Sequence, residues 1–307
     1  MIKKSKEIKL KKFLLKLYYI YLKKKDYMII LYNKYFFSKL FIPKVKSTDE
    51  TIEKLLSSKV SMSRYGDGEF SLMNRVNLKF QDYDNNLEKR LKEIIVSNKK
   101  NHIVCIPDVF EKKDIYTENA SKYWEKYIYL NLHKLKFINK RKEYYNSLVT
   151  RLYIDTKNKI KVKKRYKKIK MIWENREILL VEGNKSRIGI GNNLFEKTKD
   201  IKRIICPSKN AYFSYEKILQ EVLKNSKEKL ILIALGPTAT VLSYDLSQKG
   251  YQALDIGHID IEYEWFLSNA YEKTPVKNKY IGEILNGDIV DDLDDKIYKK
   301  QIISKVL

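Results

Sequence analysis

The sequence predicts an α/β fold: a Rossmann-like parallel sheet covered by helices, preceded by a basic helical extension. Continuous apolar runs such as LILIALG (residues 230–236) are typical of strands buried on both faces of a sheet. Stretches with helical periodicity, such as residues 87–98, alternate with these runs and indicate βαβ units. Glycines and acidic residues follow several of the strands, where ligands bind in open parallel sheets.

Residues 1–46 form a segment of their own. Lysines alternate with Leu, Ile, Phe and Tyr in the pattern of a basic amphipathic helix, and Pro43 marks a break. Fourteen Lys against Glu7 and Asp26 give this segment a charge of +12. Such a helix either lies on an anionic membrane surface or a partner, or packs against the domain with its lysines in water. The sequence leaves both interpretations open.

One domain is predicted over residues 47–287. Ser47 and Glu50 have capping-box spacing, which predicts that a helix begins there and runs through residues 51–58. The remaining predicted helices cover residues 87–98, 213–225, 237–250 and 262–270, and the tract 118–173 is expected to be largely helical. The predicted strands cover residues 60–64, 102–108, 177–183, 201–207, 230–236 and 253–257. Residues 288–307 form a charged tail that we expect to be peripheral.

The formal net charge of +25 is concentrated in two segments. Residues 156–173 carry eight Lys and Arg165 without an acid, so their +9 and the +12 of residues 1–46 account for +21. Only nine of the 63 basic residues are Arg, the residue on which readers of nucleic acids usually depend. The charge distribution therefore argues against a specific nucleic-acid partner.

The two cysteines, Cys105 and Cys206, each lie within an apolar run. Such positions indicate buried thiols, and two widely separated cysteines form neither a disulfide framework nor a zinc pattern. No stretch of about 18 uncharged apolar residues predicts a membrane span, and lysines interrupt the N-terminal apolar run. We expect a cytoplasmic protein, with residues 1–46 as a possible contact with the inner face of the membrane.

The stretch SRYGDGEF (residues 63–70) follows a predicted strand. Gly66 and Gly68 allow a tight turn, so that the carboxylates of Asp67 and Glu69 can face one point. Hard oxygen ligands of this kind suit Mg²⁺ or Mn²⁺ together with donor phosphates, and Arg64 could contact a phosphate or pair with an acid. The competing interpretation is a plain Asp-Gly turn, which the spacing alone favours.

Two further strand ends are candidate phosphate sites. In VEGNKSRIGIGN (residues 181–192), glycines would let main-chain N–H groups approach a diphosphate and an arginine would add charge. In ALGPTAT (residues 234–240), a helix begins directly after a buried strand and leaves free N–H groups. A flexible surface loop and an ordinary βα turn are equally good interpretations. The candidate donor-binding residues are Arg64, Gly66, Glu182, Gly183, Arg187, Gly189, Gly191, Asn192, Gly236, Pro237 and Thr238.

The run LDIGHIDIEYEWF (residues 254–266) places several titratable side chains directly after a strand. It contains Asp255 and Glu262, and one of only three histidines in the chain. A histidine among carboxylates is a candidate acid, base or acceptor-binding group. Alternatively, some of these acids are solvated and the histidine is a structural hydrogen bonder. The candidate catalytic residues are Asp260, Glu264 and His258, and no nucleophile motif accompanies them.

Five stretches, in the same order over roughly residues 48–285, resemble the bacterial GT-D-type glycosyltransferases: SRYGDGE, VEGxxSRxGxGN, RIICPSKNAY, LGPTATVLSYDL and DIGHIDIEYEW. The resemblance implies a Rossmann-like fold with an Asp-x-Glu motif for metal and nucleotide, here Asp67 and Glu69. It implies action on UDP-sugars, including glucosyl transfer to glycans on bacterial surface proteins. One departure is Asn193, which stands where the family pattern has Asp and puts donor choice in question.

The resemblance and the motifs together predict a hexosyltransferase that uses a UDP-sugar, with glucose as the first candidate, and Mn²⁺ or Mg²⁺. The acceptor would be a glycan on a surface protein or a polysaccharide. Asp260 is the first choice of general base, and an inverting single displacement is the simplest mechanism. The rival classes are a basic membrane- or nucleic-acid-binding module and a non-catalytic protein on the same fold; the latter would tolerate loss of Asp67 without losing a ligand.

Overall fold

The computed structural model describes residues 2–37, 43–110 and 113–307. Within these residues, nine strands form one sheet in the order β1-β4-β3-β2-β8-β7-β5-β6-β9, and every pairing is parallel. The predicted parallel α/β sheet is therefore confirmed. Its strands are β1 (Lys44–Val45), β2 (Ser61–Arg64), β3 (His102–Ile106), β4 (Glu143–Asn146), β5 (Glu177–Gly183), β6 (Asp200–Cys206), β7 (Leu230–Ala234), β8 (Gln252–Asp255) and β9 (Ile302–Lys305).

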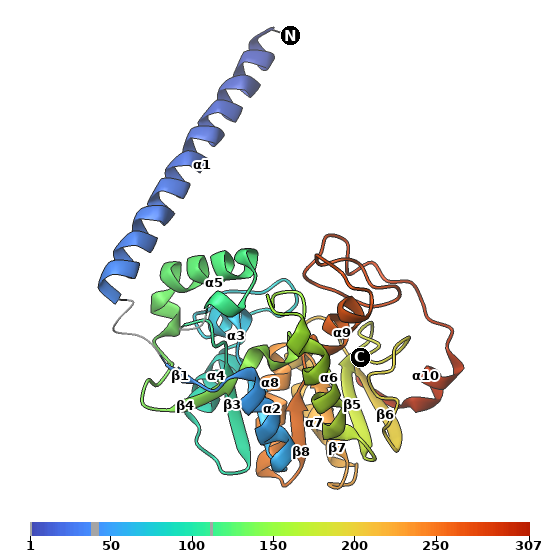
Figure 1. Cartoon of the computed structure of the whole chain (residues 1–307). Coiled ribbons are helices and arrows are strands. Elements are labelled where there is room, and N and C mark those ends of the chain that lie inside the picture. Colours follow the sequence, from blue (N-terminus) through green and yellow to red (C-terminus); the bar gives the residue numbers. More distant parts are fainter. Residues whose placement is uncertain (1, 38–42, 111–112) are drawn as a thin grey trace.

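Helices cover both faces of the sheet, so the domain has three layers (Figure 1). One core lies under α4 (Asn85–Val96), α5 (Glu118–Leu130), α7 (Tyr215–Leu223) and α8 (Pro237–Gln248). The opposite core lies under α2 (Thr48–Ser57), α6 (Ile160–Trp173) and α9 (Ile259–Leu267). Strand β7 shows why its sequence is continuously apolar: Ile231 and Ile233 belong to the first core, and Leu230 and Leu232 to the second.

The order of the strands reverses between β2 and β8. From β2 the chain proceeds outward through β3 and β4, whereas β5 to β8 fill the other half of the sheet. The two halves join where Met62 of β2 pairs with Leu254 of β8. A crevice opens at such a switch point because the neighbouring connections leave in opposite directions. The carboxyl ends of β2 and β8 are thus the place where this topology positions a site.

Helix α1 (Ile2–Phe37) confirms the predicted helical extension and projects from the domain (Figure 1). Its second half packs on α5, where the Asn33 amide donates to the carbonyl of Tyr129 at 2.6 Å and Lys34 pairs with Glu125 at 2.8 Å. The stretch from residue 10 to 21 is exposed. The ordinary-packing interpretation therefore describes only the second half of α1. No helix among the described residues is both long and apolar enough to cross a membrane.

The sequence prediction misses strands at and near the sheet edges. The tract 118–173, expected to be largely helical, contains α5 and α6 but also β4, whose four residues EYYN are too short to show a period. The C-terminal tail, expected to be peripheral, forms α10 (Lys296–Gln301) and then β9, which pairs with β6. Strand β9 alternates half-buried and exposed residues, as an edge strand does, and its Lys-containing sequence resembles a solvated tail.

Candidate active site

A cleft of about 710 Å³ opens along the carboxyl edge of the sheet. Its walls come from the segments that follow β2, β4, β5, β6, β7 and β8, together with α5 and the loop around residue 283. Pockets of this size hold drug-sized and nucleotide-sized ligands. Eight of the residues singled out from the sequence line the cleft: Arg64, Gly66, Asp67, Glu69, Gly183, Gly236, His258 and Asp260.

The Asp-x-Glu pair lies in the first turn of α3 (Asp67–Leu72). Gly66 is the N-cap, and its N–H donates to the Glu69 carboxylate at 2.8 Å, as in a capping box. Asp67 is exposed, and its carboxylate accepts a hydrogen bond from the Tyr123 hydroxyl at 2.7 Å. Residues two apart on a helix lie about 200° apart around its axis. The two acids therefore line the cleft from different sides of the turn and contact different partners.

The environment of Glu69 favours its neutral form. Burial and the nearby Asp255 carboxylate raise the pKa of Glu69 to about 7. Two carboxylates that face a low-dielectric space oppose each other's ionisation, so a positive charge between them would be stabilised. The structure thus places a carboxyl of perturbed acidity where a cation or a proton would be held.

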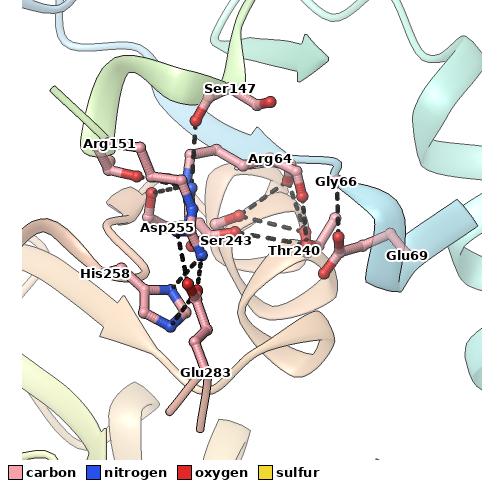
Figure 2. Close-up of polar contacts among 12 residues, drawn as sticks. Arg64, Gly66, Glu69, Ser147, Arg151, Thr240, Ser243, Asp255, His258 and Glu283 are labelled. Atoms are coloured by element: carbon pink, nitrogen blue, oxygen red, sulfur yellow. Dashed lines mark hydrogen bonds and ion pairs between the residues drawn. The ribbon is translucent and has the colours of Figure 1, made fainter. Parts of the chain in front are cut away.

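Arg64 is a half-buried strut that links the two halves of the sheet (Figure 2). Its guanidinium donates to the Asp255 carboxylate at 2.8 Å, to the carbonyl of Ser147 at 3.2 Å and to the hydroxyl of Thr150 at 2.7 Å. These contacts tie the ends of β2 and β8 to the segment after β4. The sequence left open whether Arg64 contacts a donor phosphate or pairs with an acid, and in the structure it pairs with Asp255. Because its donors are occupied, its role here is to hold the cleft wall in place.

His258 belongs to a charged cluster on the cleft wall (Figure 2). One ring nitrogen lies 3.2 Å from the Arg151 guanidinium and the other 3.2 Å from the Glu283 carboxylate. Glu283 also pairs with Arg151 and, at 2.6 Å, with Lys273. Desolvation and the Arg151 charge lower the pKa of His258 to about 3, so the ring is neutral at physiological pH. As both nitrogens have partners, His258 is poorly placed to act as a general base.

The glycine loop after β5 is held by its own polar residues. The fully buried carboxylate of Glu182 pairs with Arg203 and accepts the N–H of Ile188 at 2.7 Å. Arg187 is also buried, and it donates to the carbonyl of Asn278 at 2.9 Å. Both were expected to bind the donor, but neither lines the cleft. The side chains of Glu182 and Arg187 instead hold the loop in its conformation. Arg203, the partner of Glu182, lies on β6, so the sequence of the loop could not predict this pair.

A second network ties the glycine loop to α9. One oxygen of Asp260 accepts the N–H of Gly189 at 2.9 Å and the amide of Asn192 at 2.7 Å, and the other accepts from Lys279 at 2.7 Å. Glu264 also accepts hydrogen bonds from Asn192 and Lys279, but it lies outside the cleft lining. Asp260 does line the cleft, with three hydrogen bonds on its carboxylate. Gly189, Gly191 and Asn192 also lie outside the lining, so the loop contributes Gly183, Ser186 and Ile188 instead.

The start of α8 reaches the cleft through Gly236 alone. Gly236 has φ +53°, and a Cβ there would lie 2.8 Å from the ring of Phe80, so the position requires glycine. Pro237 occupies the first helical position, as predicted. The Thr238 side chain is fully buried, away from the cleft lining, and its hydroxyl has no hydrogen-bond partner among the described residues. The hydroxyl of Thr240 supports the strut by donating to the Arg64 carbonyl at 2.8 Å.

Sequence reasoning missed the wall formed by α5. Tyr123 and Trp124 line the cleft opposite the switch point, and their rings pack edge to face. Arg151, Asp155 and Lys273 also line it from loops. None of them follows a predicted strand or lies in a Gly-rich stretch, so local sequence carries no signal for their role. Only the folded topology brings them to the cleft.

The described residues contain no group of three or more His, Cys, Asp or Glu side chains arranged to hold a metal ion. Asp67 and Glu69 nevertheless supply oxygen donors of the type that Mg²⁺ and Mn²⁺ prefer. Mg²⁺ usually keeps several waters and is bound by one or two carboxylates together with substrate phosphates. The donor set therefore fits a cation that arrives with a diphosphate, and does not form a closed all-protein metal cage.

The fold and the cleft define a class: an open, doubly wound α/β protein with a polar site at its switch point. A family model described as the glycosyltransferase GT-D fold matches residues 62–284. The chain belongs to this family, which confirms the resemblance noted in the sequence.

Characterised relatives agree with this assignment. The chain is 38% identical over 269 residues to the glycosyltransferase GlyD of Streptococcus pneumoniae serotype 4 (strain ATCC BAA-334 / TIGR4), and 38% identical over 263 residues to the probable glycosyl transferase Gly of Streptococcus gordonii. These matches cover 87% and 85% of this chain but only 33% and 39% of the relatives. The chain thus spans little more than a third of the length of these two proteins.

Solved structures show the same fold. A domain of unknown function 1792, described as having a distinct glycosyltransferase fold, superposes with a TM-score of 0.83 at 35% identity and covers 91% of this chain and 99% of its own. A glycosyltransferase of the same domain type from Streptococcus sanguinis superposes with a TM-score of 0.82 at 38% identity, and the match covers 86% of this chain and 100% of that one.

Asn193, the residue of the glycine loop that departs from the family pattern, is exposed and lies outside the cleft lining. Its side chain accepts a hydrogen bond from the Tyr263 hydroxyl at 2.6 Å.

Proposed function

We propose that this chain is a metal-dependent glycosyltransferase that moves a hexose, with glucose as the first candidate, from a UDP-sugar to a glycan acceptor. The observation that carries the proposal is the position of Asp67 and Glu69 at the switch-point cleft of a GT-D-family chain. A diphosphate beside these carboxylates would be repelled unless a cation lay between them. This electrostatic requirement supports a divalent metal as part of the donor site.

Asp67 and Glu69 are the residues that would hold Mn²⁺ or Mg²⁺. When bound, the metal would neutralise charge on the diphosphate leaving group. Residues of the chain itself orient the two carboxylates. The Tyr123 hydroxyl holds the Asp67 carboxylate, and the capping contact with Gly66 holds Glu69, so both oxygens are oriented before a donor arrives.

The positively charged side chains that could bind the donor diphosphate in the cleft differ from those expected from the sequence. Arg64 is held by its contacts with Asp255, Ser147 and Thr150, and Arg187 lies outside the cleft lining. Lys79, Arg151 and Lys273 are the other cations that line the cleft. Arg151 and Lys273 are both anchored by Glu283, which holds their charges in fixed positions. Fixed cations stabilise developing negative charge without reorganising. We assign the diphosphate contacts to Arg151 and Lys273.

The general base must be a cleft carboxylate that can accept a proton from the acceptor hydroxyl. Asp260 was the first choice, but its oxygens carry three hydrogen bonds, including one from Lys279. Asp155 lines the same cleft, and its carboxylate makes no hydrogen bond within the described residues. We therefore rank Asp155 ahead of Asp260. A direct attack by the hydroxyl on the anomeric carbon would invert its configuration.

The acceptor side of the proposal rests on the aromatic wall. Tyr123 and Trp124 line the cleft, and aromatic side chains with a few polar groups are typical of pockets for small organic ligands. We propose a glycan on a bacterial surface protein or a polysaccharide as the acceptor, modified in the cytoplasm before export. The product's linkage and anomeric configuration follow from NMR of the purified glycan.

The first test is calorimetric titration of UDP into the full chain with and without Mn²⁺. We expect metal-dependent binding, and at least a ten-fold loss of affinity in Asp67→Asn because one of two metal-binding carboxylates is removed. Asp294→Asn is the matched control: it removes an exposed carboxylate that pairs with Lys299 and lies outside the cleft lining. UDP-glucose turnover is then measured on the same proteins, with Asp155→Asn expected to lower kcat at least a hundred-fold.

Four outcomes would each count against a part of the proposal. UDP binding that is absent with and without metal would favour the non-catalytic protein on the same fold. Equal affinity of Asp67→Asn and Asp294→Asn would remove the Asp-x-Glu pair from the donor site. A product that retains the donor's anomeric configuration would exclude the single displacement. An Asp155→Asn variant with unchanged kcat would return the role of general base to Asp260.

A further inference from the structure

The exposed face of α1 is an interaction surface that the cleft does not use. The side of α1 toward α5 is accounted for by Leu22, Asp26, Ile30 and Asn33, of which Asn33 bonds Tyr129. Large apolar side chains are exposed on several sides of α1, and one set of them forms a continuous line on the side away from α5. The exposed fractions of this set range from 46% to 81%, and its members are Leu10, Leu14, Leu17, Tyr21, Met28, Tyr32 and Tyr35.

The spacing of these residues puts them on one stripe. Successive members are separated by three, four or seven residues, which returns to nearly the same angle around an α-helix. Lys24 and Lys25 border this stripe, one on each side, whereas Lys12, Lys16 and Lys23 lie on the opposite side of the helix; all five are exposed. An apolar stripe of this length, left in water, marks a surface that another body covers.

The charge of α1 distinguishes between two partners for this stripe, a second copy of the helix and an anionic lipid surface. Between residues 10 and 35 the helix has seven lysines and one acid, Asp26, which lies 3.6 Å from Lys126 of α5. Two such helices side by side would oppose lysine to lysine, with no acids left to pair across the interface. An anionic lipid surface offers the opposite charge, and lysine side chains can extend their ammonium groups to phosphates while their stems lie along the apolar surface.

We propose that α1 docks this protein onto an anionic membrane surface. Leu14, Leu17 and Tyr21 enter the boundary between headgroups and acyl chains, and the lysines contact lipid phosphates. Tyrosine suits this boundary, since one end of its side chain is apolar and the other is polar. The helix lies outside the cleft, so the proposal stands independently of the proposed activity.

The arrangement also orients the cleft. In Figure 1, α1 rises from the side of the molecule where α3, α5 and α9 lie, and residues of all three helices line the cleft. The free stretch of twelve residues from 10 to 21 spans about 18 Å at 1.5 Å per residue. A chain held by this stretch is therefore tethered from the side of the molecule on which these cleft-lining helices lie.

Co-sedimentation of the full chain with phosphatidylcholine vesicles, with and without added phosphatidylglycerol, tests the proposal. We expect binding only to the anionic vesicles, and salt should weaken it. Replacing Lys11, Lys12 and Lys16 with Gln should lower the apparent affinity at least about ten-fold. Replacing Leu14, Leu17 and Tyr21 with Gln should lower it similarly. The matched control replaces Lys163, Lys164 and Lys167 of α6, which are equally exposed, and should leave binding unchanged.

Each alternative occupant gives a distinct result. Equal losses in the α1 and α6 lysine variants would mean that net charge alone drives binding, and would overturn the proposal. Concentration-dependent dimerisation in sedimentation velocity, abolished by the apolar variant and accompanied by no vesicle binding, would assign the stripe to a second copy of the chain. Retained UDP binding in every variant confirms that the domain is folded and separates this test from the proposed activity.

Discussion

At the scale of single residues, the cleft depends on a glycine that no ligand need contact. Gly257 has φ +44°, and a Cβ at this position would collide with the guanidinium of Arg64. Arg64 in turn joins Asp255, Ser147 and Thr150. A side chain at residue 257 would therefore break the strut between the two halves of the sheet, as well as strain the backbone.

We expect Gly257→Ala to lower the free energy of unfolding by about 3 kcal/mol, because strain adds to the displacement of Arg64, a half-buried arginine whose guanidinium is paired. Gly191→Ala is the matched control: its φ is +82°, but a Cβ there meets nothing within 4 Å. Strain alone should cost Gly191→Ala about 1 kcal/mol. Urea unfolding of the two variants measures both values, and equal losses would show that the Arg64 strut contributes nothing.

Residue roles were predictable only where they follow from position after a strand. Asp67, Glu69, His258 and Asp260 line the cleft because parallel strands end at one edge of the sheet. What each polar group contacts was not predictable. The sequence around Arg187 cannot show that its donor reaches the carbonyl of Asn278, 91 residues away. Long-range hydrogen bonds such as this one decide whether a charged side chain is available to a ligand.

At the scale of elements, burial on both faces made strands recognisable. Strands β5 and β7 were predicted at nearly their observed bounds because each contains a continuous apolar run of at least four residues. Strand β9 was not predicted, since an edge strand alternates and tolerates lysine. Its helix α10 nevertheless contributes to the interior: Gln301 accepts a hydrogen bond from the buried Arg203 at 2.7 Å, and Arg203 lies over the ring of Tyr298.

Ending the chain after Asp294 should therefore destabilise the domain. The truncation removes α10 and β9, uncovers the edge of β6 and leaves Arg203 without its Gln301 partner. We expect a loss of about 2–4 kcal/mol in the free energy of unfolding, measured with urea. Removing only Leu307, which is 72% exposed, is the control and should change little. A truncated protein with the parent's midpoint would mean that β9 is a dispensable edge.

At the scale of the whole molecule, two sets of buried groups act oppositely on stability. Burial raises the pKa of Glu69 and Glu262 to about 7 and lowers the pKa of His102 and His258 to about 3. The folded carboxyls keep protons that the unfolded chain has released, so rising pH between about 4.5 and 7 lowers stability. The unfolded imidazoles bind protons that the folded ones do not, so falling pH below about 6.5 lowers stability.

Replacing Glu262 with Gln isolates one of these contributions. Glu262 is fully buried, and its carboxylate accepts the N–H groups of Tyr153 at 2.8 Å and Ile154 at 3.0 Å. The parent should lose up to about 3 kcal/mol through this group between pH 4.5 and 7, and the variant should not. Urea unfolding across this range gives the difference curve, with exposed Glu272→Gln as the control. Parallel curves for the parent and Glu262→Gln would contradict the assignment.

The pairing of β2 with β8 has a consequence for the order in which this protein can be assembled. Met62 and Leu254 are partners across the centre of the sheet, although 191 intervening residues separate them. During synthesis, the backbone edge of β2 has no neighbour on this side until β8 has left the ribosome. Such non-local pairing is slow and leaves strand edges open to aggregation. The site that the switch point creates is thus among the last parts of the domain to form, and an incomplete chain has no working cleft.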